Sequence, residues 1–294
     1  MNFTDIERAA CQHLVELALQ EDLGSAGDLT SQAVIHENLQ GRAVFHARKV
    51  GVLSGLSAAE LVVQAVDPTI SFEPLVRDGS MIHAGQALAR VQGRMRGILS
   101  AERTALNFLQ RLSGVATQTR HFVDAVAGLS AQILDTRKTT PGWRLLEKYA
   151  VRCGGGANHR MGLHDGVLIK DNHLEAEGHG ATKPIRLAVE QARVSFGKRY
   201  PIEVEVDTLD ELDQALQSEV DVILLDNMTL EQMREAVNRR NSRGRGTRLE
   251  ASGGVTLATI RSIAETGVDR ISVGALTHSA PALDIALDYE KEPA

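Results

Sequence analysis

The chain has 294 residues, of which 43% are hydrophobic and 24% charged, and its formal net charge is -6. This length is enough to bury a large core in one or two domains, and the composition excludes a disordered or fibrous protein. The excess of acidic residues argues against nonspecific nucleic-acid binding, which needs a basic surface. Cys11 and Cys153 are too few for a disulfide framework or a structural zinc site, so we expect them to pack in the core.

The N-terminal segment mixes acidic and apolar residues and lacks the order of a secretory signal. Since no apolar run approaches the ~20 residues of a membrane span, we expect a cytoplasmic protein. Thr4 and Glu7 have capping-box spacing, and apolar residues then recur at helical intervals. This pattern predicts a first helix that ends before the loop "EDLGSAGDLTS".

Residues 41–93 are typical of a small α+β unit, with short strands around one helix at about 57–66. The stretch "DGSMIHAGQALARVQG" resembles half of a biotinyl or lipoyl carrier domain, but it holds no lysine to bear a cofactor, so we interpret it as scaffold. Helical periodicity returns near residue 96, and we expect two helices that are broken near Ser113 and Gly114.

After Gly128 short apolar runs alternate with helical segments: "AQILDTRK", "GVLIKDN", "IEVEVD", "DVILLDN", "LEASGG" and "RISVGA". This alternation predicts parallel strands with crossover helices. Six strands favour an incomplete barrel over a full one, although an open doubly wound sheet has the same alternation. The last segment, "APALDIALDYEKEPA", is interpreted as a final helix and a frayed tail.

Cations concentrate between Arg137 and Lys170. Four of them are expected to have a function, because they stand at strand ends or next to glycines: Arg137, Lys138, Arg160 and Lys170. Three others, spaced four apart, are interpreted as a solvated helix face: Arg144, Lys148 and Arg152.

The segment "CGGGANHRMGLHDG" is consistent with a plain flexible turn or with a backbone that approaches an anionic ligand. Its histidines lack metalloenzyme spacing, so we expect no dedicated zinc site. Glu205 and Asp226 each end a strand, where such a pair can bind sugar hydroxyls or Mg²⁺. The glycine turns "SGGV" and "SVGALTHSAP" are typical of phosphate cradles at helix N-termini.

Eight segments together resemble the quinolinate phosphoribosyltransferase family: "EDLGSAGDLTS", "AERTALNFLQRLSGVAT", "LDTRKTTPG", "RCGGGANHRMGLHDGVLIKDNH", "EVEVDTLDEL", "LLDNM", "EASGGV" and "SVGALTHS". The resemblance runs nearly end to end. It departs mildly at Trp143, where an aliphatic residue is expected, and in the long stretch between His173 and Pro201.

The resemblance implies an α/β fold with an N-terminal α+β (α/β sandwich) domain, residues 1–114, and an incomplete TIM-like α/β barrel, residues 115–279. A C-terminal helix, 280–294, would return to the first domain. It also implies a homodimer, or a higher assembly, with a shared active site. The reaction would join quinolinate to 5-phosphoribosyl pyrophosphate with Mg²⁺, giving nicotinate mononucleotide, pyrophosphate and CO₂ for NAD biosynthesis.

The resemblance also assigns site residues. The quinolinate carboxylates would be surrounded by Arg103 (from the partner subunit), Arg137, His159, Arg160 and Lys170. Thr136 and Lys138 would act at the same site and toward the pyrophosphate, while Glu205 and Asp226 would address the ribose and the metal. The 5'-phosphate would be held by Ser252, Gly253, Gly254, Val273, Gly274 and Ala275. Catalysis itself would rest on Lys138, Lys170, Glu205 and Asp226.

Three alternatives stay open. A related transferase could act on nicotinate or another ring acid without decarboxylation, but the surplus of cations is enough for two carboxylates. A non-enzymatic carrier is opposed by the missing lysine. A phosphate-binding barrel isomerase would have the late glycine turns but no reason to place Arg137 and Lys138 beside Arg160.

Overall fold

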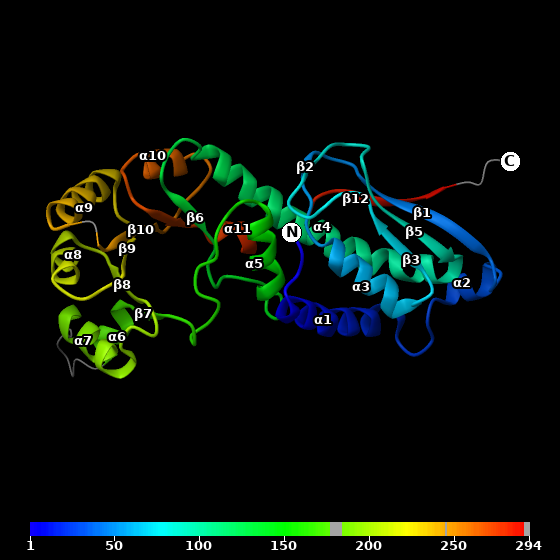
Figure 1. Cartoon of the computed structure of the whole chain (residues 1–294), viewed down its shortest axis with the longest axis horizontal. Helices are drawn as coiled ribbons and strands as arrows, with labels where there is room; N and C mark the ends of the chain where they lie inside the picture. Colours follow the sequence, from blue (N-terminus) through cyan, green and yellow to red (C-terminus); the bar gives the residue numbers. More distant parts are fainter. Residues whose placement is uncertain (177–183, 245, 291–294) are drawn as a thin grey trace. The chain divides into compact units, whose positions relative to one another are not determined.

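A computed structural model describes residues 1–176, 184–244 and 246–290, and the chain divides into two compact units (Figure 1). The first unit comprises residues 1–120, 139–155 and the segment from Leu276 onward, and the second comprises 121–138 and 156–275. The division into domains 1–114 and 115–279 stays a prediction. Among the described residues, no helix has both the length and the apolar character that a membrane crossing requires.

The first unit is built on a four-stranded antiparallel sheet in the order β12-β1-β5-β3, beside a two-stranded sheet of β2 and β4. Its elements are α1 (Asp5–Leu23), α2 (Leu29–Val34), β1 (Gln40–Ala47), β2 (Gly51–Val52), α3 (Leu56–Val66), β3 (Ser71–Pro74), β4 (Met81–Ile82), β5 (Ala87–Arg94), α4 (Met95–Ala125), α5 (Arg144–Cys153) and β12 (Ile285–Glu290). The last turn of α4, after Arg120, already belongs to the second unit.

The core of the first unit lies between this sheet and two helices. Phe45 of β1, Val63 of α3 and Ile98 of α4 surround one small apolar space, so both helices pack on the same face of the sheet (Figure 1). The capping box of α1 is confirmed, because Thr4 accepts a hydrogen bond from the Glu7 amide and its own amide donates to the Glu7 carboxylate. Both cysteines are buried, as expected.

The predicted break near Ser113 and Gly114 is wrong, because α4 is one helix of 31 residues. A Cβ atom at Gly114 would lie 2.1 Å from the carbonyl oxygen of Pro281. The glycine therefore permits a close approach of two segments and does not end the helix. Ser113 also makes a tertiary contact, because its hydroxyl accepts a hydrogen bond from the Ser54 amide at 3.0 Å.

The predicted C-terminal helix, 280–294, is also wrong. Residues Ile285–Glu290 form β12, which pairs antiparallel with β1. Burial alternates there, with Ile285 and Leu287 nearly covered and Ala286 half-buried between them, which is the period of a strand. Residues 291–294 lie outside the described residues, as does 177–183 of the long stretch noted above.

Helix α5 does not present the solvated charged face that was predicted. Glu147 and Lys148 are fully buried, and the Glu147 carboxylate accepts hydrogen bonds from Arg111. Arg152 pairs with Glu7, and Arg144 donates to the Thr139 hydroxyl. The spacing alone could not predict this, because charged residues four positions apart on a helix can form ion pairs in the interior of a domain as well as face solvent.

The second unit is a parallel sheet in the order β6-β11-β10-β9-β8-β7. Its elements are β6 (Gln132–Leu134), β7 (Val167–Ile169), α6 (Asp171–Ala176), α7 (Ile185–Phe196), β8 (Ile202–Val206), α8 (Leu209–Leu216), β9 (Val222–Asp226), α9 (Leu230–Ser242), β10 (Arg248–Ser252), α10 (Ile260–Ala264), β11 (Arg270–Ser272) and α11 (Ala275–His278), which begins at the unit boundary.

The strand order identifies an incomplete barrel. From β7 to β11 each strand pairs with the next in sequence, and β11 then pairs with β6. An open doubly wound sheet would instead reverse its order at a switch point. Of the pairings that would close the ring, the one between β6 and β7 is missing among the described strands. The predicted fold class is confirmed.

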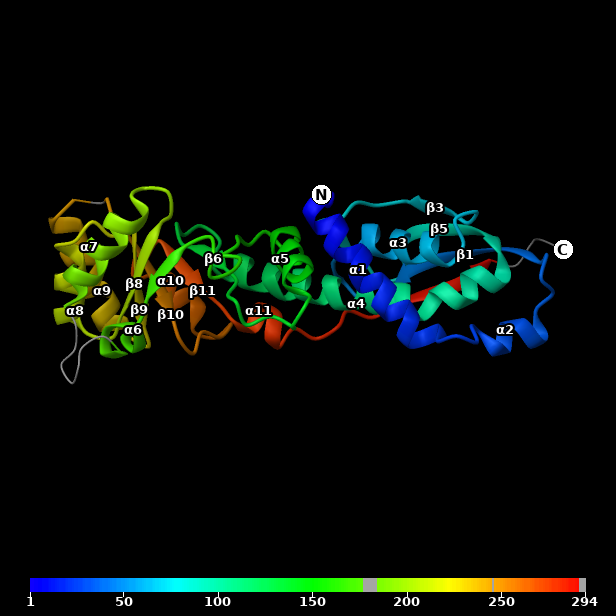
Figure 2. The ribbon, with the colours of Figure 1, turned by 90° about the horizontal axis from the view of Figure 1, so that it is seen from below.

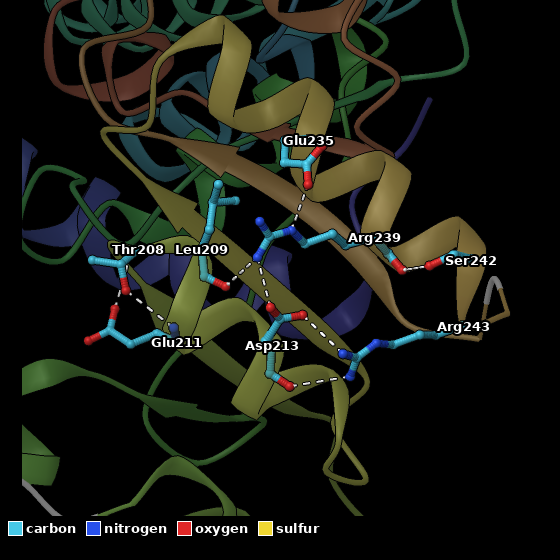
Figure 3. A network of polar contacts seen from close by, with 8 residues as sticks. All are labelled: Thr208, Leu209, Glu211, Asp213, Glu235, Arg239, Ser242 and Arg243. Carbon is cyan, nitrogen blue, oxygen red and sulfur yellow. Dashed lines mark hydrogen bonds and ion pairs between the residues drawn. The ribbon is translucent and has the colours of Figure 1, made fainter.

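Helices α7, α8 and α9 lie outside β8 and β9 (Figure 2). Asp213 of α8 forms ion pairs with Arg239 of α9 at 2.7 Å and with Arg243, the residue directly after α9, at 3.1 Å (Figure 3). Thr208 and Glu211 cap α8 in the same view. This network ties neighbouring outer helices together.

Alternation along the strands gives the barrel a polar interior. In β8, Val204 and Val206 are buried, whereas Glu205 lines a cavity together with Leu224 and Glu250 of the next two strands. Successive side chains of a strand point to opposite faces, so in β8 the valines face the helices and the glutamates face inward.

Candidate active site

A cavity of about 520 Å³ lies in the second unit at the carboxyl ends of its parallel strands. Active sites of α/β barrels lie at this end. The cavity brings together most of the residues that the sequence singled out: Thr136, Arg137, Lys138, His159, Arg160, Lys170, Glu205, Asp226, Ser252, Gly253 and Gly254.

Four predicted residues are not part of the cavity lining. Val273 is buried, and its amide donates to the Leu134 carbonyl at 2.9 Å; Gly274 and Ala275 follow it. Arg103 belongs to α4 in the first unit, where its side chain is exposed.

Arg137 and Lys138 both reach the cavity because β6 has already ended. The strand stops at Leu134, and the Lys138 amide then donates to the Thr136 hydroxyl at 3.0 Å, which turns the chain. Neighbours inside a strand would point to opposite faces. Beyond its end, two adjacent cations can serve one site.

Positive charge gathers on this wall of the cavity. Burial and the charge of Arg137 lower the pKa of Arg160, although a guanidinium stays protonated throughout. Arg160 also donates to the Gly166 carbonyl at 3.1 Å, and Asp165 accepts from the amides of Met161 and Gly162. The loop is thus fixed while two like charges are held near each other, an arrangement that favours a bound anion.

Asp135 is a supporting residue that was not predicted from the sequence. It is fully buried and accepts hydrogen bonds from the Asn158 side chain at 2.6 Å and the His159 amide at 2.9 Å. These bonds anchor the segment carrying His159 and Arg160 to the end of β6. The only signal was its position directly after a buried strand.

His159 also contacts a buried group of charges below the cavity. Its Nε2 lies 2.9 Å from Glu203 and 3.4 Å from Glu250, and Arg270 lies 2.9 Å from the other Glu250 oxygen. Burial lowers the pKa of His159, but the hydrogen bond and charge of Glu203 and the charge of Glu250 outweigh it and raise the pKa overall. Burial and the charge of Glu203 raise the pKa of Glu250 to about 7.

Another part of the cavity lining, at the ends of β8 and β9, is acidic. Lys170 of the loop after β7 forms an ion pair with Glu205, and Asp226 accepts from the Asn227 side chain at 2.7 Å. Burial, followed by the charge of Asp226, raises the pKa of nearby Asp207. A concentration of carboxylates at the ends of β8 and β9 is therefore present in the fold.

Two loops beside these acids depend on special backbone geometry. Asn227 has φ 53°, a conformation that asparagine tolerates better than most residues. Gly253 has φ +95°, and a Cβ there would lie 2.1 Å from the Asn227 side chain. Only glycine fits, so the loop after β10 can bring backbone amides into the cavity.

Gly154, the first residue of the triple glycine, has a packing role. A Cβ at Gly154 would lie 2.3 Å from the Ala116 carbonyl oxygen, so this residue allows α5 to end against α4. Trp143, at the start of α5, stacks on Phe108 of the same unit with ring centroids 4.8 Å apart. Both features serve packing within the first unit.

Two sets of residues are candidates for a metal. Glu205 and Asp226 supply the carboxylate oxygens that Mg²⁺ prefers, at the mouth of a cavity large enough for a phosphorylated ligand. His159, Glu203 and Glu250 each place one atom within 4.8 Å of the others. Because the Arg270 guanidinium already lies against Glu250, this second set fits a buried ion-pair cluster better than a resident metal.

The geometry therefore joins a cationic wall, an acidic wall and a glycine loop in one cavity. The cationic wall suits a polyanionic ring acid, because guanidinium groups bind carboxylates with paired hydrogen bonds. The acids suit sugar hydroxyls, and backbone amides suit phosphate. Such a site can hold two anionic substrates side by side.

Comparisons with known proteins agree with this geometry. Residues 28–113 match the model of the quinolinate phosphoribosyl transferase N-terminal domain, and residues 115–288 match that of the C-terminal domain. A nicotinate-nucleotide pyrophosphorylase (carboxylating) of Mycobacterium leprae is 45% identical over 97% of this chain and 99% of its own. A quinolinate phosphoribosyltransferase (decarboxylating) of Nicotiana tabacum is 43% identical over 96% of this chain and 82% of its own.

A solved structure gives the same result. The nicotinate-nucleotide pyrophosphorylase of Francisella tularensis superposes with a TM-score of 0.90 at 39% identity, covering 98% of this chain and 100% of that one. The fold, the cavity at the strand ends and both domain models thus agree, and the chain belongs to the quinolinate phosphoribosyl transferase family.

Proposed function

We propose that the chain transfers a phosphoribosyl group from 5-phosphoribosyl pyrophosphate to quinolinate and releases pyrophosphate and CO₂, giving nicotinate mononucleotide for NAD biosynthesis. The observation that carries this proposal is the cavity in which Arg137, Arg160 and Lys170 share one ligand space. Membership of the family supports the same activity.

The cationic wall would reduce the electrostatic repulsion between the two anionic substrates, which is the main obstacle to the reaction. Quinolinate carries two carboxylates, and its partner carries several phosphate charges. Arg137, Arg160, His159 and Lys170 would offset this repulsion, with the arginines gripping carboxylates in their forked geometry. Thr136 orients this segment through its bond to the Lys138 amide.

The ring nitrogen of quinolinate would attack the anomeric carbon as the bond to pyrophosphate breaks. Positive charge develops on the sugar, where Glu205 and Asp226 would stabilise it, and negative charge develops on the leaving group, beside Lys138. The alkylated nitrogen is then cationic, so the adjacent carboxylate departs as CO₂ and the carbanion left behind takes up a proton.

The proposed reaction uses Mg²⁺ that is bound to the substrate 5-phosphoribosyl pyrophosphate. Mg²⁺ carried by the pyrophosphate would neutralise the leaving group, and Glu205 and Asp226 have the oxygen donors to hold it near the ribose. The loop of Ser252, Gly253 and Gly254 would bind the 5'-phosphate with its backbone amides. Val273, Gly274 and Ala275 do not line this cavity, and their assignment to the phosphate rests on the family resemblance alone.

We also propose that the active unit is a homodimer acting in the cytoplasm. The support is Arg103, an exposed cation on α4 that the family resemblance assigns to a partner's site. Mixing the impaired Arg103→Ala protein with the impaired Lys170→Ala protein should give more activity than either protein alone, through heterodimers. No recovery after verified subunit exchange would contradict a shared site.

The central experiment is incubation with quinolinate, 5-phosphoribosyl pyrophosphate and Mg²⁺, followed by measurement of CO₂ and nicotinate mononucleotide. Nicotinate serves as the control acid. Product from quinolinate with CO₂ release supports the proposal, whereas turnover of nicotinate alone would favour the transferase that does not decarboxylate.

A further inference from the structure

The buried charges around His159 suggest a role that the reaction scheme above does not include. Glu203, Glu250 and Arg270 come from β8, β10 and β11, so three strands converge on one imidazole from inside the barrel. The Glu250 side chain is 0% exposed and the His159 side chain 9%. His159 nevertheless lines the cavity, so it links the buried cluster with the ligand space.

With both carboxylates ionised, the charges of this cluster balance when His159 is protonated. Two carboxylates face one guanidinium, which is always charged. A buried carboxylate without a compensating cation is costly, and His159 is the titratable cation in contact with both acids. An imidazolium therefore makes the group of four neutral.

Ion pairs hold the four groups together. The Nε2 of His159 lies 3.4 Å from one Glu250 oxygen and the Nε of Arg270 lies 2.9 Å from the other, so Glu250 bridges the imidazole and the guanidinium. Replacing a carboxylate by an amide of the same shape should therefore change the cluster mainly through its charge.

Other charges near His159 act on it from the remaining sides. Asp135 accepts a hydrogen bond from its backbone amide, and the charge of Arg270 opposes protonation of the ring. Arg137 and Arg160 line the same cavity. Glu203 and Glu250 lie closer and act on the ring itself.

We propose that Glu203, Glu250 and Arg270 are positioning residues that hold His159 as a cation, with Nε2 turned into the barrel, so that a charged imidazole meets the ring acid. This inference rests on the proposed function for the identity of the acid. The state of the imidazole itself is independent of that identity and can be measured without substrate.

The test compares Glu250→Gln with wild type by NMR of ¹⁵N-histidine-labelled protein, with His159→Asn to assign the signal. We expect the His159 pKa to fall by about one unit or more in Glu250→Gln, which corresponds to a tenfold change in the protonation equilibrium. Asp78→Asn is the matched control, because Asp78 is also a buried carboxylate but lies in the first unit. It should leave the His159 signal unchanged.

Kinetics give a second readout. The KM for quinolinate should rise with pH as His159 loses its proton, and that rise should begin about one pH unit lower in Glu250→Gln, with a smaller effect on kcat. If Glu250→Gln fails to fold, Glu203→Gln takes its place. Arg270→Lys keeps the charge count and should retain a His159 pKa near that of wild type.

An unchanged His159 pKa in the glutamine variant, or a neutral His159 in wild type at pH 6, would overturn the inference. So would a divalent metal that copurifies with the wild type and is lost from Glu250→Gln. A shifted pKa in a protein without quinolinate activity would instead uphold the cluster and reject the proposed function.

Discussion

Lys170 and Glu205 form an ion pair between the ends of the neighbouring strands β7 and β8. The Glu205 side chain is 14% exposed, and both residues line the cavity, so the pair is held together before any ligand arrives. A pair of this kind joins the cationic wall to the acidic one. Substrate binding must then either keep it or exchange it for ligand contacts.

Lys170→Ala is expected to lower kcat/KM for quinolinate. Loss of a charged hydrogen bond costs about 1.5–3 kcal/mol, which is roughly a 10- to 100-fold decrease. Glu205→Gln should also lower activity, and the double variant should lose less than the product of the single losses because the two side chains are in contact. Steady-state kinetics of wild type, the two single variants and the double variant form a double-mutant cycle. If the two single losses multiply strictly in the double variant, the two side chains do not act as a unit.

Arg137→Ala is expected to weaken quinolinate use by a similar factor, roughly 10- to 100-fold in kcat/KM, because it removes a guanidinium from the cavity wall. Arg137→Lys should recover only part of this, since an ammonium lacks the forked geometry. Arg186→Ala is the control, because Arg186 forms an exposed pair with Glu190 on α7. Unchanged efficiency in Arg137→Ala would remove this residue from the proposed site.

The sequence predicted the parts of the fold that depend on local pattern. The six strands of the second unit were found because each is an apolar run with a polar end, and their convergence placed Lys170 and Asp226 at one cavity. The C-terminal strand was missed because "IALDYE" is too short to separate a period of two from a helical one, and its pairing with β1 depends on residues far away in the chain.

The supporting residues were harder to predict than those lining the cavity. Glu250 and Arg270 meet only because β10 and β11 are neighbours in the sheet, and no local motif marks either residue. Gly114 had a local signal, but it pointed to a helix break, whereas the glycine accommodates Pro281. Tertiary contacts decided each of these positions.

Gly114→Ala should destabilise the first unit, since the added methyl group meets backbone that cannot move aside as a side chain can. Overpacking of this kind costs about 1–3 kcal/mol, partly offset by the higher helix propensity of alanine. Thermal unfolding followed by circular dichroism should show a lower Tm. Gly246→Ala is the control, because no atom lies within 4 Å of the added Cβ, and its Tm should stay close to that of wild type. Equal Tm values for the two variants would contradict the packing argument.

Asp28 caps α2, and its contribution should depend on pH. Its carboxylate accepts from the Ser31 amide at 2.9 Å and from the Ser31 hydroxyl, and these bonds lower the pKa of Asp28 below its usual 3.8. A depressed pKa means that the stabilisation is complete above about pH 4 and is lost as the pH falls through the lower value of the folded state. Asp28→Ala should therefore cost about 1 kcal/mol at pH 7, and the difference from wild type should shrink in acid. Urea unfolding of wild type and Asp28→Ala at pH 7 and pH 3 measures this difference in the free energy of unfolding. Asp28→Asn is the control, because it retains an acceptor for the Ser31 amide without the charge. A difference between wild type and Asp28→Ala that does not change with pH would show that the carboxylate's charge contributes nothing to the cap.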